Sequence, residues 1–493
     1  MSRDAVFTFD NSYAAELEGF YIPWKGERAP EPKLVQLNRS LAAELGLDAD
    51  TLAGERGASF FSGSEAPEGA APLAQAYAGH QFGDFSPQLG DGRALLIGEL
   101  IDRNGRRRDL QLKGSGKTPF SRGGDGKAVL GPVLREYLIG EAMHALGIPT
   151  TRALAAATTG VMVMREAPEP GAVLARVAAS HLRVGTFQFF AARGETAQLR
   201  QLADYAIRRH DPDLTDASDR YLGLLRRVRD RQAALVAQWL SVGFVHGVMN
   251  TDNVAISGET LDYGPCAFID DYDPVATFSS IDRRGRYAYG HQPAIAQWNL
   301  ARLAETLLPL IDPQDTAHAI EVATDAIDEF PTIYQDIWQT EMQAKLGLGT
   351  RKDGDQDLVN DLHTAMDGQH VDFTLLFRHL AEGLRGDMSP ARALFDDPTA
   401  LDPWLARWSA RLAEGGGNSH ALAAEMDRVN PAYIPRNHLV EQALVAASSS
   451  SDFGPFERLL EVLERPFERR AGLEDYEGPA PDEFGPYVTY CGT

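Results

Sequence analysis

Apolar and polar positions divide the chain into a first part with strand-like patterns and a second part with helical spacing. Residues 94–100 are a short apolar run, and residues 108–113 alternate between apolar and polar. Asn104-Gly105 lies between them, and this dipeptide between two strand-like runs predicts a β-hairpin. A further strand is predicted over 173–178, and helical spacing predicts helices over 129–146, 219–242 and almost all of 290–445.

The order of these elements predicts an α+β fold with a β-rich N-terminal lobe and an extended helical C-terminal lobe. We place an N-terminal extension at 1–75, the β-rich lobe at 76–190, the helical lobe at 191–470 and a tail at 471–493. The tail is acidic and contains Gly and Pro, so we expect it to be flexible and loosely packed.

Charge and composition exclude several classes of function. The 493 residues carry a formal net charge of −23, which argues against a nucleic-acid partner because phosphate contacts need clustered Lys and Arg. No apolar run approaches the roughly 18 residues of a membrane span, and the N-terminal residues resemble no signal or transit peptide. We therefore expect a cytoplasmic protein with no membrane partner. Two cysteines are too few for a disulfide framework or a Cys-based zinc site.

One short region, from His246 to Gly264, carries most of the chemical information. Protein kinases have the pattern H-R-D-L-x-x-x-N followed by D-F-G, in which the first Asp is the base and the Asn and second Asp bind magnesium. Here His246, Asn253 and Asp262 lie at matching positions, but Val248 occupies the position of the base. Because valine cannot accept a proton, the sequence predicts a protein-kinase-like two-lobe fold that keeps metal–nucleotide binding and lacks ordinary kinase chemistry.

Transfer of phosphoryl or nucleotidyl groups also needs cations on the phosphates. The stretch 90–93 (GDGR) precedes a predicted strand and suits a glycine turn over phosphates, although a tight hairpin turn gives the same pattern. Lys113 ends the next strand, where kinases have their phosphate-binding lysine; a surface lysine is the alternative. In the following helix either Glu136 or Glu141 could pair with Lys113, and periodicity does not choose between them.

Two arginines are further candidates. Arg176 is a charge inside an apolar strand, which indicates a buried partner. Arg183 follows it and, like Arg176, could hold a triphosphate through the forked donors of its guanidinium group. A structural salt bridge is the alternative for each.

Two other features are interpreted as structural. The stretch 114–118 (GSGKT) resembles the end of a P-loop, but the full pattern needs Gly at the position of Gln111, and no helix is predicted directly behind it. The histidines of interest occur singly, so we expect hydrogen-bonded structural roles for them rather than a metal site: His80, His181 and His246.

Four long segments, 77–99, 112–143, 243–270 and 430–444, resemble the selenoprotein O family. The resemblance covers most of the chain, and its motifs are too long for chance similarity. It implies a protein-kinase-like fold that lacks the usual catalytic Asp and binds ATP in a flipped orientation. It also implies transfer of AMP from ATP to Ser, Thr or Tyr hydroxyls of protein substrates, redox proteins among the candidates, with release of pyrophosphate.

Carried onto this chain, the resemblance implies an ion pair between Lys113 and Glu136, with Asp252 as the proton acceptor. Asn253 and Asp262 would hold Mg²⁺, with Mn²⁺ as an alternative metal. The residues implied to line the ATP site are Gly90, Gly92, Arg93, Lys113, Asp125, Gly126, Arg176 and Arg183. The cations among them would stabilise the pyrophosphate leaving group.

Two other functions stay open. A true kinase could recruit Asp252 as its base for γ-phosphoryl transfer, and a non-catalytic scaffold could bind nucleotide alone. Val248 weighs against the kinase, and the retained pair of Asn253 and Asp262 weighs against the scaffold.

The two cysteines suggest a redox hypothesis. Many eukaryotic members of the family carry selenocysteine three residues from the C-terminus, where this chain has Cys491. Cys266 closely follows Asp262. We hypothesise that oxidation joins Cys266 to Cys491 and pins the tail against the active-site cleft. Two unrelated thiols are the alternative.

Overall fold

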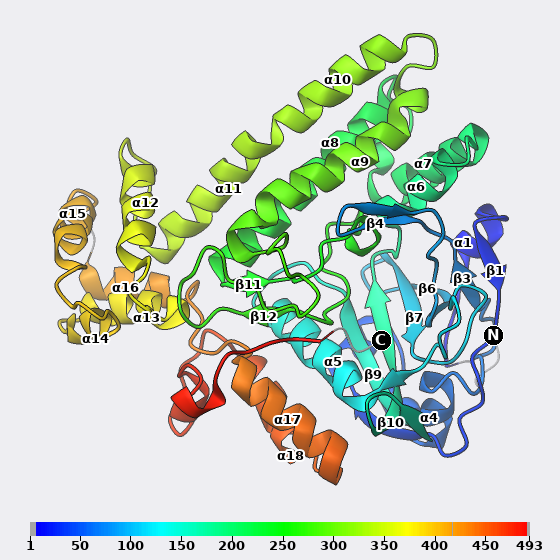
Figure 1. The fold of residues 1–493 in the computed structure, drawn as a ribbon, viewed down its shortest axis with the longest axis horizontal. Helices are drawn as coiled ribbons and strands as arrows, with labels where there is room; N and C mark the ends of the chain where they lie inside the picture. The colour runs from blue at the N-terminus through cyan, green and yellow to red at the C-terminus, as the bar shows by residue number, and fades with distance from the viewer. Residues whose placement is uncertain (1–5, 417, 491–493) are drawn as a thin grey trace.

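One antiparallel sheet organises the N-terminal part of the chain in the computed structural model, which describes residues 6–416 and 418–490 (Figure 1). Neighbouring strands follow the order β1–β3–β6–β7–β10–β9–β2, and β8 pairs with β10. The strands are β1 (Tyr21–Pro23), β2 (Lys33–Leu37), β3 (Leu73–Gln75), β6 (Ala94–Ile101), β7 (Arg107–Lys113), β8 (Ala128–Val129), β9 (Arg152–Met164) and β10 (Pro168–Ala178). Residues before position 76 thus supply three strands to the sheet.

The hairpin predicted at Asn104-Gly105 is confirmed as the β6–β7 pair, whose register joins Ala94 to Lys113. Gly105 has a φ of 76°, a left-handed conformation that glycine adopts without steric cost. The carboxylate of Asp102 accepts the N–H of Asn104 at 2.9 Å and holds the turn. Because β7 lies between β6 and β10, the hairpin places Lys113 at the end of a central strand.

The sheet is buried on both faces. Along β10, Val173 and Ala175 belong to one apolar core, and Ala172 and Leu174 belong to another. Because side chains alternate between the two faces of a strand, the two cores lie on opposite sides of the sheet. Three short N-terminal helices, α2, α3 and α4, cover one side. The short helix α1 and α5, which is the helix predicted over 129–146, lie on the other. These helices are α1 (Ser12–Glu16), α2 (Arg39–Glu44), α3 (Ala49–Leu52), α4 (Glu55–Phe61) and α5 (Leu130–Ala145).

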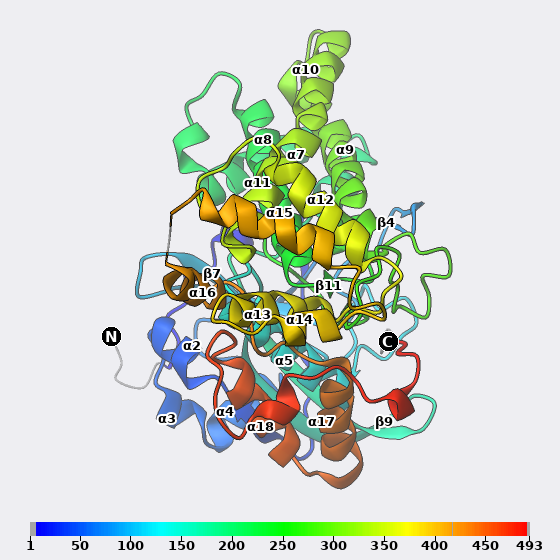
Figure 2. The same cartoon turned by 90° about the vertical axis from the view of Figure 1, so that its left-hand side faces the viewer.

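The second part of the chain is helical, as predicted. Its elements before the last two helices are α6 (Val184–Ala191), α7 (Thr196–His210), α8 (Arg220–Ser241), α9 (Gln292–Ile311), α10 (Thr316–Asp328), α11 (Phe330–Lys345), α12 (Asp355–Met366), α13 (Phe373–Gly383), α14 (Ser389–Ala393), α15 (Asp402–Ala413) and α16 (Ser419–Asp427). Helices α12–α16 gather on the side of the molecule away from the sheet (Figures 1 and 2). In the described part of the chain, no helix is long and apolar enough to cross a membrane.

The last two helices, α17 (Asn437–Ser450) and α18 (Gly454–Leu463), return to pack against α5. The rings of Tyr137 and Phe456 meet edge to face, with centroids 5.9 Å apart. The sequence predicts a loosely packed tail, but the described part of the tail makes specific contacts. Arg135 donates to the Tyr487 hydroxyl at 2.8 Å, and the Thr489 hydroxyl donates to the Pro265 carbonyl at 2.8 Å. The acidic composition of the tail gives no sign of the few side chains that hold the tail in place.

Candidate active site

The motif region lies between two short strands, β11 (Phe244–Val245) and β12 (Ala267–Phe268), which pair with each other. Pairing closes the stretch into a loop, and its turn η2 (Thr251–Asn253) presents two polar side chains in succession. Val248, Asp252, Asn253 and Asp262 all line one cavity of about 400 Å³. This volume lies within the range of small-molecule sites.

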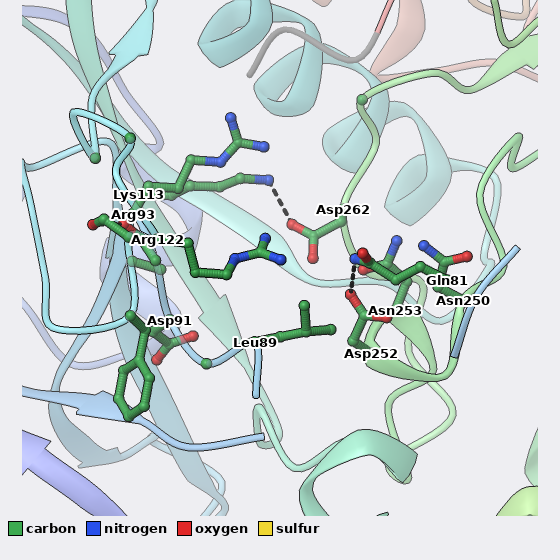
Figure 3. A pocket seen from close by; sticks show the side chains of 18 of the residues that line it. Gln81, Leu89, Asp91, Arg93, Lys113, Arg122, Asn250, Asp252, Asn253 and Asp262 are labelled. Carbon is green, nitrogen blue, oxygen red and sulfur yellow. Dashed lines mark hydrogen bonds and ion pairs between the residues drawn. The ribbon is translucent and has the colours of Figure 1, made fainter. Parts of the chain in front are cut away.

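The same cavity is lined by every residue that the sequence assigns to the ATP site, but Glu136 lies behind its wall. The lining residues among the predicted set are Gly90, Gly92, Arg93, Lys113, Asp125, Gly126, Arg176, Arg183, Asp252, Asn253 and Asp262. Figure 3 shows Lys113 and Asp262 pointing toward each other, with Asp252 and Asn253 beside them and Arg122 pointing into the space between. Segments more than 170 residues apart therefore meet at one site.

A cluster of four charged side chains lies at the cavity wall, and three of them line the cavity. The Lys113 Nζ lies 2.6 Å from Glu136 Oε2 and 2.5 Å from Asp262 Oδ1. The guanidinium group of Arg176 donates to Glu136 Oε1 at 2.9 Å and to Asp262 Oδ1 at 2.7 Å. Two cations and two carboxylates thus satisfy one another away from bulk water, which is the condition for holding buried charges.

The geometry chooses Glu136 over Glu141 as the partner of Lys113. Glu141 lies one turn further along α5 and accepts from Arg152 at 2.9 and 2.7 Å and from Asn38 at 2.7 Å. These contacts join α5 to β9 and to the start of α2. Glu141 is therefore committed to structural contacts.

Asp262 has an unusual backbone and an unusual charge environment. Its φ is 66°, a left-handed conformation that non-glycine residues adopt mainly where the surroundings impose it. Burial opposes ionisation of its carboxyl group, but Lys113, Arg176 and Arg183 outweigh burial and hold its pKa well below the ordinary value. The three cations around Asp262 thus favour its charged form.

Arg176 and Arg183 both make structural contacts, which was one of the two roles that the sequence left open. Arg176 is buried on β10 and also donates to the side chain of Gln111 at 2.5 Å. Arg183, at the start of α6, donates to the backbone carbonyl of Asp252 at 2.8 Å, and its guanidinium lies 4.5 Å from the centre of the Tyr77 ring. Both side chains make structural contacts and both line the cavity.

Two loops pack on each other at the edge of the cavity. Gly90 has a φ of 69°, and a Cβ there would lie 2.3 Å from the Phe120 ring. The Thr118 hydroxyl donates to the Asp91 carbonyl at 2.6 Å, and the Ser121 hydroxyl donates to the Gly92 carbonyl. The stretch 114–118 is therefore a loop that packs on residues 90–93 rather than a P-loop, and α5 begins only at Leu130.

Asp125 and Gly126 complete the second loop. The Asp125 carboxylate pairs with Arg165 at 2.8 Å and accepts the N–H of Lys127 at 2.9 Å. Gly126 has a φ of 69°, and a Cβ there would lie 2.2 Å from the carbonyl oxygen of Gly116. Close backbone contact thus requires glycine at this position.

Asp252 is a cavity carboxylate that forms no ion pair with the cavity cations. It is buried, its Oδ1 has no hydrogen-bond partner, and burial raises its pKa to about 6. The neighbouring Asn253 donates its Nδ2 to the Val248 carbonyl at 3.1 Å, which leaves the amide oxygen for another ligand. A carboxyl group with a raised pKa and an amide whose oxygen is not used by Val248 therefore lie side by side.

Comparison with known proteins decides the family. The family described as "Protein adenylyltransferase SelO" matches residues 5–464. The chain belongs to this SelO family. A protein of Cereibacter sphaeroides named "Protein nucleotidyltransferase YdiU" is 60% identical over 99% of this chain and 100% of its own length. Proteins of the same name from Rhizobium meliloti and Chromobacterium violaceum are each 58% identical, over 99% and 96% of this chain and 100% and 99% of their own lengths.

Membership assigns this SelO-family chain to the protein nucleotidyltransferases, a class of enzymes. The cavity has the donors that such chemistry uses. A hard divalent cation bound with a nucleotide takes only one or two carboxylates from the protein, and phosphates and water supply its other ligands. Asp262 Oδ2 is 3.5 Å from Arg183 and is less engaged than Oδ1, so it and the Asn253 amide oxygen fit a Mg²⁺ site.

Within the described residues, no group of three or more His, Cys, Asp or Glu side chains is arranged to hold a metal ion by itself. The histidines are confirmed as hydrogen-bonded: His80 lies 2.8 Å from Gln188, His181 lies 3.0 Å from Asp109, and His246 lies 2.9 Å from the Leu261 carbonyl. Any metal at the cavity therefore depends on the few oxygen donors described above.

Sequence reasoning missed Asp91, Arg122 and Gln81, which also line the cavity. Asp91 is fully buried, and burial raises its pKa to about 6. Its place between the two glycines of the 90–93 stretch is a signal that could have been used. Nothing local distinguishes Gln81 or Arg122 from surface residues, because only folding brings them to the cavity.

Cys266 is buried, and its thiol donates to the Tyr263 carbonyl at 3.2 Å. Burial raises the pKa of the thiol to about 12. The tail contact between Thr489 and Pro265 lies next to it in sequence. Cys491, its hypothesised disulfide partner, lies outside the described residues.

Proposed function

We propose that this SelO-family enzyme transfers AMP from ATP to a Ser, Thr or Tyr hydroxyl of a protein and releases pyrophosphate. One observation carries the proposal beyond the family name. The buried Val248 occupies the place of the kinase base, and the nearby Asp252, a buried carboxylate with one unpaired oxygen, lines the same cavity. Compared with a kinase, the proposed acid–base group is at Asp252 instead of position 248, whereas the proposed metal ligands Asn253 and Asp262 are at the kinase positions.

In the proposed step the acceptor oxygen forms a bond to the α-phosphorus. The bond from that phosphorus to the oxygen that bridges to the β-phosphate breaks, and pyrophosphate leaves with the electron pair. The acceptor proton moves to Asp252. With a pKa raised by burial to about 6, its carboxylate is mostly ionised at neutral pH and is a stronger proton acceptor than an ordinary Asp.

The cations of the cavity would stabilise the leaving group. Lys113, Arg176 and Arg183 are held in place by the carboxylates around them, so they cost little reorganisation when phosphates bind. Asn253 and Asp262 would hold Mg²⁺ or Mn²⁺, which supplies charge neutralisation on the phosphates when bound. Glu136 would orient Lys113 from behind the wall.

We also propose that the molecule is a protein-kinase-like fold, with the sheet and α5 as one lobe and the helical part as the other. The ion pair between Lys113 on a central strand and Glu136 on α5 supports this comparison. The spacing of His246, Asn253 and Asp262 within the loop supports it as well.

The test is transfer of label to a protein acceptor, or to the enzyme itself, from ATP labelled at either phosphate. We expect the α-label on the protein and an added mass of one AMP unit, with transfer by Asp252→Asn slower by roughly 10²–10⁴-fold but still measurable. Transfer of the γ-label with a phosphate-sized added mass would instead establish a kinase that uses Asp252 as its base. Binding of ATP without transfer of either label would establish a scaffold.

A further inference from the structure

A small hairpin with no assigned role lies against the loop that carries Asp252. It consists of β4 (Gly79–Gln81) and β5 (Asp84–Ser86). The N–H of His80 donates to the Thr251 hydroxyl at 2.6 Å, and the N–H of Phe82 donates to the Asn250 side chain at 3.0 Å. The hairpin is thus fixed to the residues immediately before Asp252.

Contact with Asp252 itself is closer still. A Cβ at Gly79 would lie 2.4 Å from Asp252 Oδ1. The φ of Gly79 is not in the left-handed region, so its backbone does not itself require glycine, and the three atoms nearest to an added Cβ all belong to the Asp252 side chain. The hairpin therefore encloses this carboxylate and sets how it can turn.

Gln81 supplies the polar part of that enclosure. Its Nε2 donates to Asp252 Oδ2 at 3.4 Å, and Figure 3 shows the two side chains facing each other. Among residues 6–416 and 418–490, no other side chain donates to this carboxylate, and Oδ1 is buried without a partner. Hydrogen bonds at catalytic groups are often long before substrate binds, so 3.4 Å is compatible with a working contact.

A neutral amide suits this position. A cation there would stabilise the carboxylate and weaken it as a proton acceptor, whereas an amide fixes the rotamer with a smaller effect on charge. A cation is close, because Arg183 already donates to the Asp252 backbone carbonyl at 2.8 Å. A carboxylate that lost its contact with Gln81 would be free to turn toward that guanidinium.

We propose that Gln81 is a positioning residue that acts through Asp252, by donating to Oδ2 and so fixing the rotamer of this carboxylate beside the cavity. This inference rests on the proposed function, in which Asp252 receives the acceptor proton. The β4–β5 hairpin is then the wall of the site next to Asp252. Gly79 leaves room for the Asp252 carboxylate, and Gln81 donates a hydrogen bond to it.

The test is a double-mutant cycle of Gln81→Met and Asp252→Asn, with transfer of α-label as the readout. We expect Gln81→Met to lower kcat by roughly 10–100-fold, the usual cost of losing a group that orients a catalytic residue. The Kd for a non-hydrolysable ATP analogue with Mg²⁺ and the melting temperature should stay at wild-type values. In the Asp252→Asn background the same change should have no further effect, because residues that act as a unit are not additive.

An equal loss of kcat in both backgrounds, or no loss in the wild-type background, would overturn the inference. Absence of α-label transfer by the wild-type enzyme would instead refute the proposed function, so the two failures are distinguishable. Gln88→Met, at an exposed glutamine just beyond the hairpin, is the matched control and should leave kcat unchanged.

Gly79→Ala tests the enclosure without touching the glutamine. Its added methyl group would displace the Asp252 side chain, so kcat should fall while nucleotide affinity is retained. Gly54→Ala, where nothing lies within 4 Å of the added Cβ, is the control. Wild-type kcat for Gly79→Ala would show that the hairpin does not set the position of Asp252.

Discussion

Two buried arginines in this molecule are each held by two carboxylates, but their surroundings differ. Arg176 pairs with Glu136 and Asp262, and Arg436 pairs with Asp270 at 2.6 Å and with Asp372 at 2.7 Å. Arg436 also donates its remaining N–H groups to the Glu477 carbonyl, at 2.6 and 3.0 Å. It therefore joins α17 to the tail and to two segments of the helical part.

The arginine in the cavity is satisfied less completely. The Nε of Arg176 has no partner, and Arg176 and Asp262 both line the cavity. Arg436 itself is fully buried, and its cluster borders no part of that cavity. Ion pairs alone do not mark a functional site. Unused hydrogen-bonding capacity next to an open cavity distinguishes the cluster that can receive a ligand from the one that holds the chain together.

The largest effect is expected at Asp262. Asp262→Asn removes a carboxylate that a hard cation requires, so transfer of α-label should fall to background. The melting temperature should fall less than in a variant of the Arg436 cluster, because Glu136 still pairs with both cations and the cavity admits water. Label transfer and thermal melts check both points.

The exposed Asp353→Ala is the control for that change and should behave as wild type. Near-normal transfer by Asp262→Asn would show that the cavity cluster is structural, like the cluster around Arg436.

The next effect concerns Asp252. Asp252→Ala should lower kcat by roughly 10²–10⁴-fold, which is the usual contribution of a positioned general base. Nucleotide affinity should change little, because Asp252 makes no ion pair with the cavity cations. Steady-state kinetics with a protein acceptor, together with calorimetric titration of a nucleotide analogue, measure the two quantities. An unchanged kcat would leave the proton acceptor unassigned.

Arg436→Ala tests the ion-pair cluster of Arg436 with Asp270 and Asp372. Removing one partner leaves Asp270 and Asp372 uncompensated, so the free energy of unfolding should fall by about 3–5 kcal/mol. Denaturant unfolding measures this loss. Label transfer per folded molecule should be retained, and a specific loss of transfer without loss of stability would contradict the comparison.

The smallest effect is expected at Lys345, a buried lysine for which the described residues offer no carboxylate within ion-pairing distance. Burial lowers its pKa to about 7, although its Nζ lies 4.2 Å from the centre of the Phe377 ring. Lys345→Met should therefore raise the free energy of unfolding at pH 7, by about 1–3 kcal/mol after allowance for the lost cation–π contact.

The sign of its pH dependence follows from the lowered pKa. The unfolded chain binds a proton at Lys345 more tightly than the fold does, so the gain from Lys345→Met is full below about pH 7 and shrinks as pH rises toward 10. Denaturant unfolding at pH 7 and pH 9.5 measures it. The exposed Lys25→Met is the control, and a gain that did not shrink with pH would exclude the titration of Lys345 as its cause.

Local patterns predicted a large share of this molecule. The β6–β7 hairpin follows from Asn104-Gly105, and α5 and α8 follow from helical spacing with errors of about one residue at each end. The spacing of Val248, Asn253 and Asp262 is enough by itself to locate the loop that lines the cavity. These features depend on residues close together in sequence, whose interactions survive in any fold that contains them.

Tertiary structure decided the rest. Glu136 and Glu141 lie on the same helix, and only the position of β7 relative to α5 brought one of them to Lys113. Gln81 and Asp252 are 171 residues apart, and only the docking of a small hairpin joined them. The order of residues determines which groups a segment carries. Which of these side chains come into contact depends on strand register and on the packing of elements distant in sequence. Local periodicity contains no information on register or on that packing.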